Sequence, residues 1–161
     1  MKVSTRMRVG RIFFLIFSVI FASCVTVQIF IAGMAVFVDP VNWVNHHVFA
    51  HLFGFNLPVI MVIMALAAGV PRRIYFQLFG VFATVFLMYF SANITAQWPW
   101  MGAVHPVIAL VLFLLSCLIV VDAWRLIANT PRVRNQTDID SLNSSIGDLS
   151  RQNKERDEVE Q

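Results

Sequence analysis

Four long apolar runs separated by short polar breaks make up most of the chain. The runs cover about residues 12–38, 44–70, 74–96 and 101–121. A helix needs roughly 20 apolar residues to cross the hydrocarbon core of a bilayer, and every run is at least that long. The runs are continuously apolar and lack the two-residue alternation of membrane β-strands. The pattern therefore predicts four membrane-spanning helices and an all-α fold.

The breaks between the runs contain residues that end helices. Asp39 and Pro40 follow the first run, Pro71-Arg72-Arg73 follows the second, and Gln97-Trp98-Pro99-Trp100 follows the third. Because these connections are short, sequential helices should be antiparallel neighbours in an up-down-up-down four-helix bundle. We expect this domain to cover residues 12–126, after a basic N-terminus of residues 1–11.

Composition and charge support a membrane protein and indicate its orientation. Of 161 residues, 58% are hydrophobic and 13% are charged, with a mean hydropathy of +0.73, which excludes a water-soluble globular domain. Nine Lys and Arg residues lie in the N-terminus, the 71–73 loop and the 125–134 segment, and none lies in the other two loops. The positive-inside rule then predicts an inner-membrane protein with both termini cytoplasmic. Since the basic residues flank apolar spans, no nucleic-acid binding is expected.

The remaining segment, residues 127–161, is polar. From Pro131 onward it holds five basic and seven acidic residues, and the poor helix formers around Gly147 favour a disordered cytoplasmic tail. Four aliphatic residues with a 3, 4, 3 spacing offer the alternative of a short coiled-coil seam, formed by Ile139, Leu142, Ile146 and Leu149.

Uncharged polar residues inside the spans are the most informative positions, because each unpaired polar group in hydrocarbon costs free energy. With a rise of about 1.5 Å per residue, they lie roughly 5 to 17 Å below the outer boundary. They are Gln28, His47, His51, Asn93 and His105. The cytoplasmic half holds little besides Gln77. This distribution predicts a site in the outer leaflet.

The histidines suggest the chemistry of that site. His47 and His51 are four residues apart and share a helix face, while His105 opens the fourth span. In the expected bundle the second and fourth helices are diagonal, so His51 and His105, with His47 as the substitute for His51, are candidate axial ligands of haem b. Gly54 would leave room for the ring. The same three histidines are alternatively ligands of a transition-metal ion, and Gln28 and Asn93 complete the candidate site.

A structural interpretation stands beside this hypothesis. His46 is shallow enough to be an interfacial side chain. His51 could be a buried histidine that hydrogen-bonds to Gln28 or Asn93, and Gln28 could be a helix–helix hydrogen bond. Asn56 is expected to cap carbonyls freed by Pro58.

The order of these features resembles a known family. The features are a basic start, Trp43 and histidines opening the second span, Pro71-Arg72-Arg73, Val27-Gln28-Ile29-Phe30-Ile31-Ala32-Gly33 and His105-Pro106-Val107-Ile108-Ala109. The chain is similar, over roughly residues 8–127, to the bacterial four-helix membrane family known as domain of unknown function 6220. The resemblance implies a membrane fold but no activity.

Three functions remain open at this point. The first is a membrane protein whose histidine cluster binds haem b or a metal ion, and the second is a non-catalytic subunit that packs against other membrane subunits or itself. The third, a small channel or carrier, is disfavoured because the polar residues stop halfway across the bilayer. No nucleotide loop, nucleophile elbow or carboxylate pair is present, which argues against carboxylate chemistry and favours a non-enzymatic role while leaving enzyme activity open.

Overall fold

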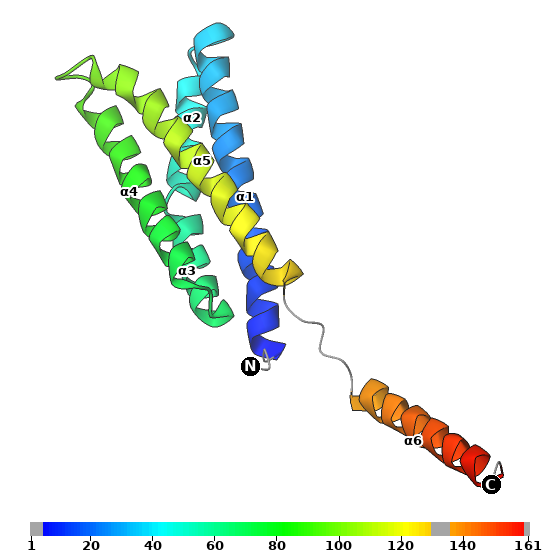
Figure 1. Ribbon diagram of the computed structural model, residues 1–161. Coiled ribbons are helices and arrows are strands. Elements are labelled where there is room, and N and C mark those ends of the chain that lie inside the picture. Colours follow the sequence, from blue (N-terminus) through cyan, green and yellow to red (C-terminus); the bar gives the residue numbers. More distant parts are fainter. Residues whose placement is uncertain (1–4, 130–135, 160–161) are drawn as a thin grey trace. The chain divides into compact units, whose positions relative to one another are not determined.

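The computed structural model describes residues 5–129 and 136–159, and this part of the chain contains helices and no strand (Figure 1). The helices are α1 (Thr5–Phe37), α2 (Asn42–Phe53), α3 (Asn56–Ala68), α4 (Arg72–Ile94), α5 (Met101–Ala128) and α6 (Gln136–Val159). The all-α class predicted from the sequence is confirmed.

The helices form four spans that are long and apolar enough to cross a membrane: α1, the α2–α3 pair, α4 and α5. Two boundaries differ from the predicted ones, because α1 begins at Thr5 and α5 continues to Ala128. Arginine is a good helix former, so these helices extend beyond their apolar runs into charged sequence.

The second span is broken at Gly54 and Phe55, which separate α2 from α3. Pro58 follows, and its missing N–H cannot donate to the carbonyl of Gly54. Asn56 does cap a carbonyl, but its Nδ2 donates to Leu52 O at 2.8 Å. The cap thus stabilises the end of α2 at Leu52, and the expectation that Asn56 caps the carbonyl freed by Pro58 is not met.

The end of α3 is set by Gly69, whose φ of 58° lies in the left-handed region. Its N–H donates to the carbonyls of Ala65 and Leu66, and Val70 N donates to Ala65 O at 3.4 Å. This is the Schellman arrangement, and Pro71 directly after it prevents the helix from continuing.

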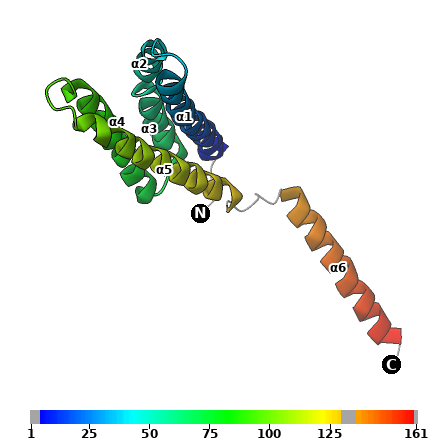
Figure 2. The same ribbon diagram turned by 90° about the horizontal axis from the view of Figure 1, so that it is seen from above.

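The four spans pack as a ring (Figures 1 and 2). Helix α1 packs against α2, α3 and α5, and α4 packs against α3 and α5. Among the described residues the backbones of α2 and α3 do not pack directly against α5, so these spans are diagonal. The start of α1 meets the ends of α3 and α5, since Arg11 donates to Ala68 O and Leu126 O, both at 3.4 Å. A pair of side chains that joins α2 to α5 must therefore cross the middle of the ring.

The core is narrow, and much of the apolar surface faces outward. Phe14, Met61, Ile74 and Ile119 are almost completely buried between the helices. Large apolar side chains remain exposed on every span, among them Phe30, Leu66, Phe79, Val107 and Trp124. In water such a surface would be strongly unfavourable, whereas lipid solvates it. The spans therefore belong in contact with lipid.

The tail forms a unit of its own. The sequence favoured disorder here, but residues Gln136–Val159 form the helix α6. Arg, Gln, Lys and Glu are concentrated after Ser150, and their helix propensity outweighs the cost of Gly147. Of the predicted seam, Leu142, Ile146 and Leu149 are exposed, and the side chain of Ile139 lies outside the described ones.

Candidate functional site

The histidine opposite His105 is His46. The two rings come from the starts of α2 and α5, their centroids are 6.5 Å apart, and their planes are tilted by 59°. Both side chains are partly buried. The edge of Trp43 contacts His46 at a centroid distance of 5.5 Å, and the His47 ring lies 6.3 Å from it. The histidine of α2 that lies near His105 is therefore His46, for which the sequence suggested an interfacial position, and not His51 or His47.

Gln28 connects α1 to this pair. Its Nε2 donates to the backbone carbonyl of His46 at 2.8 Å, so the helix–helix hydrogen bond that the sequence suggested for Gln28 is present. Two atoms of these residues, Gln28 Oε1 and His46 Nδ1, are buried without a protein hydrogen-bond partner. A buried unpaired polar atom typically costs about 1–3 kcal/mol. A third such atom among the described residues, Gln77 Oε1, lies outside this cluster.

His105 is oriented by Ser91, a completely buried residue of α4. Ser91 Oγ donates to Met88 O at 3.0 Å and lies 2.9 Å from His105 Nδ1. The hydroxyl has one proton, so in the tautomer where that proton goes to Met88, its oxygen accepts from the Nδ1–H of His105. This assignment from the hydrogen-bond network leaves Nε2 of a neutral His105 with a lone pair, as a metal ligand requires.

His51 lies in different surroundings. Its side chain is exposed, and its ring contacts Tyr89 at a centroid distance of 5.3 Å. The space beside Gly54, which the sequence assigned to a haem ring, is taken by Tyr89, because a Cβ on Gly54 would lie 3.1 Å from the phenolic oxygen. Tyr89 also donates to Ala50 O at 2.9 Å and stacks on Phe55.

The other two predicted site residues on the helices, His47 and Asn93, have exposed side chains. His47 is exposed but touches the ring of His46. Asn93 is exposed and donates to Tyr89 O within its own helix at 2.9 Å, so it has a local partner. Among the described residues no three His, Cys, Asp or Glu side chains are grouped so that they could hold a metal ion. The structure thus brings Gln28, His46 and His105 together.

Two members of the cluster escaped sequence reasoning. His46 looked interfacial because it lies at a shallow depth, and its side chain points about 100° away from that of the neighbouring His47 around the helix. Ser91 carried no signal, because serine in membrane helices commonly bonds to its own backbone. The position of a serine or histidine around a nearly uniform apolar helix is not encoded in its neighbours.

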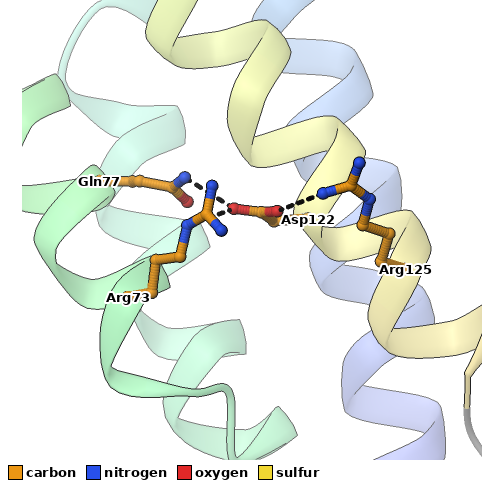
Figure 3. A network of polar contacts seen from close by, with 4 residues as sticks. All are labelled: Arg73, Gln77, Asp122 and Arg125. Atoms are coloured by element: carbon orange, nitrogen blue, oxygen red, sulfur yellow. Dashed lines mark hydrogen bonds and ion pairs between the residues drawn. The ribbon is translucent and has the colours of Figure 1, made fainter.

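A second polar cluster lies where α4 starts and α5 ends (Figure 3). Asp122 of α5, whose side chain is 11% exposed, accepts a hydrogen bond from Gln77 Nε2 at 2.8 Å. Its Oδ2 also pairs with Arg73 Nε at 3.2 Å, and its Oδ1 with Arg125 Nη1 at 3.7 Å. The sequence indicated only that Asp122 marks the end of a span.

Comparison with known proteins gives one family and no individual relative. No curated protein and no solved structure matches the chain. Residues 28–96 match the model of the family of unknown function DUF6220. The matched segment contains Gln28, His46 and Ser91, while His105 lies outside it. The match supports the resemblance drawn from the sequence over residues 28–96, a shorter stretch than the roughly 8–127 expected, and there this membrane-type helical chain is similar to the family of unknown function DUF6220.

Proposed function

We propose that the protein binds haem b between its second and fourth spans, with His46 and His105 as the axial ligands. The observation that carries the proposal is the 6.5 Å separation of the two ring centroids on diagonal spans. Imidazole nitrogens bind metal ions at about 2.0–2.1 Å, so two rings on opposite sides of one ion have their centres roughly 6 Å apart. The pair is close to that separation.

The number of ligands favours haem over a bare ion. A bare Zn²⁺ or similar ion takes three or four protein ligands, and the described residues offer no such group. Haem brings four nitrogens of its own, so two protein imidazoles complete the iron's coordination. When bound, the iron would supply one-electron chemistry, and this chain's residues would hold it in place.

The surrounding residues fit a ligating role. With the Nδ1–H of His105 donating to Ser91 Oγ, Nε2 would be the nitrogen left free to bind a metal. If His46 also ligates through Nε2, its Nδ1 carries a proton and needs an acceptor. Gln28 Oε1 is a buried acceptor without a partner in the residue already bonded to His46. The two unpaired atoms are chemically complementary in the ligated state.

The test is the visible absorption of the full chain purified in detergent, in oxidised and reduced forms. We expect a Soret band that shifts on reduction, or, if the chain purifies without haem, the same spectrum after titration with haemin to one equivalent. Elemental analysis of the same sample identifies any bound metal, and the Soret band shows whether bound iron is in haem. A colourless chain that takes up neither haemin nor metal would contradict the proposal and leave a structural membrane subunit as the better account.

A further inference from the structure

The cluster around Asp122 lies apart from the histidines and has an excess of positive charge. We propose that Arg73 and Arg125 bind the phosphate group of an anionic phospholipid at the edge of the leaflet where α4 starts and α5 ends. The proposal does not depend on haem binding.

Asp122 fixes the two arginines in place. The carboxylate is largely buried, contacts Arg73 through one oxygen and Arg125 through the other, and is itself held by Gln77 (Figure 3). An arginine side chain normally loses considerable rotamer freedom when it binds an anion. Because this carboxylate already restrains both side chains, less of that freedom is lost when a further anion binds.

The charges around the carboxylate do not balance. Two guanidinium groups contact one carboxylate, which leaves a net charge of +1, and Arg72, the sequence neighbour of Arg73, adds a further positive charge at the start of α4. The side chains of Arg73 and Arg125 are 66% and 65% exposed. Each guanidinium has five N–H donors and gives one nitrogen to Asp122. Donors therefore remain on both arginines for the oxygens of a phosphate.

The surroundings of the arginines are those of a lipid and not of a soluble anion. Phe76 and Trp124, each 63% exposed, flank the cluster on α4 and α5, and the Arg72 guanidinium lies over the Phe76 ring at 5.5 Å. Exposed aromatic side chains at the end of a span lie at the level of lipid headgroups. A ligand at this place would set its charged group on the arginines and its acyl chains along apolar side chains, which describes an anionic phospholipid.

The experiment measures the thermal unfolding midpoint of the full chain in phosphatidylcholine nanodiscs with and without phosphatidylglycerol. We expect phosphatidylglycerol to raise the midpoint of the wild type by several degrees, and the double variant Arg73→Gln/Arg125→Gln to lose most of that gain. The matched control is Arg6→Gln/Arg8→Gln, which removes the same charge from exposed positions on α1 and should keep the gain. The readout compares two lipids for the same variant, so a general loss of stability cancels.

Three outcomes would overturn the proposal. The first is a full gain in the Arg73→Gln/Arg125→Gln variant, and the second is an equal loss in the α1 control. The third is a comparable gain from inorganic phosphate in phosphatidylcholine alone, which would assign the site to a soluble anion. If the double variant does not fold, Arg72→Gln replaces it, because Arg72 contacts the Phe76 ring and is not paired with Asp122. Its gain should then fall below that of the wild type, and an unchanged gain would contradict the proposal.

Discussion

The His105→Ala variant should purify without the Soret band expected of the wild type. The substitution removes one of two axial ligands, and no other described histidine lies on α5 to replace it. The absorbance of the Soret band relative to protein should therefore fall to the level of protein without haem. The measurement uses the same detergent and the same haemin titration for both proteins.

Ser91→Ala is the graded control for that result. It keeps the His105 ring but removes the acceptor of its Nδ1–H, and loss of such a partner typically costs about 10- to 100-fold in metal affinity. We expect weakened haemin binding in this variant, with a band of unchanged position. A His105→Ala protein that has the unfolding midpoint of the wild type and keeps the full Soret band would show that His105 is not a ligand.

Gly10→Ala should destabilise the bundle more than any other glycine-to-alanine change in α1. A Cβ at residue 10 would lie 2.9 Å from Ala68 N and 3.0 Å from Ala68 Cα. These are backbone atoms that cannot rotate away, so α1 and α3 must move apart. Overpacking of this kind costs about 1–3 kcal/mol. The neighbouring hydrogen bond from Arg11 to Ala68 O would lengthen as well.

Gly33→Ala is the matched control, because a Cβ there meets nothing within 4 Å. Within a helix, where the added Cβ meets no clash, the change from glycine to alanine gains up to about 1 kcal/mol. Thermal unfolding in detergent should place Gly10→Ala below the wild type and Gly33→Ala level with it or above. The same midpoint for both variants would mean that α1 does not approach α3 as closely as described.

The four spans could be read from the sequence, whereas the rotation of each helix could not. A run of about 20 apolar residues is sufficient to predict a membrane helix, because burial of backbone groups leaves few alternatives. Its rotation depends on which side faces protein, and α2 has large apolar residues on every side. The i, i+4 spacing correctly placed His47 and His51 on a common face, but that face is exposed.

Contacts between residues that are far apart in the sequence could not be predicted either. Gln77 and Asp122 are 45 positions apart, and each alone is typical of a residue near the end of a span. Their hydrogen bond follows from the way α4 packs on α5. Pro58 in the sequence indicates a break in the second span. The hydrogen bond from Asn56 to the Leu52 carbonyl, by contrast, depends on the local geometry of Gly54 and Phe55.

The choice between His46 and His51 tests the account most directly. Five residues separate them, which places their side chains roughly 140° apart around α2. The measurement that decides between the two histidines is the Soret absorbance relative to protein. It is recorded for His46→Ala and for His51→Ala, each titrated with haemin in detergent. We predict that His46→Ala loses the band and His51→Ala retains it in full. A band lost in His51→Ala and kept in His46→Ala, or kept in both, would contradict the site described above.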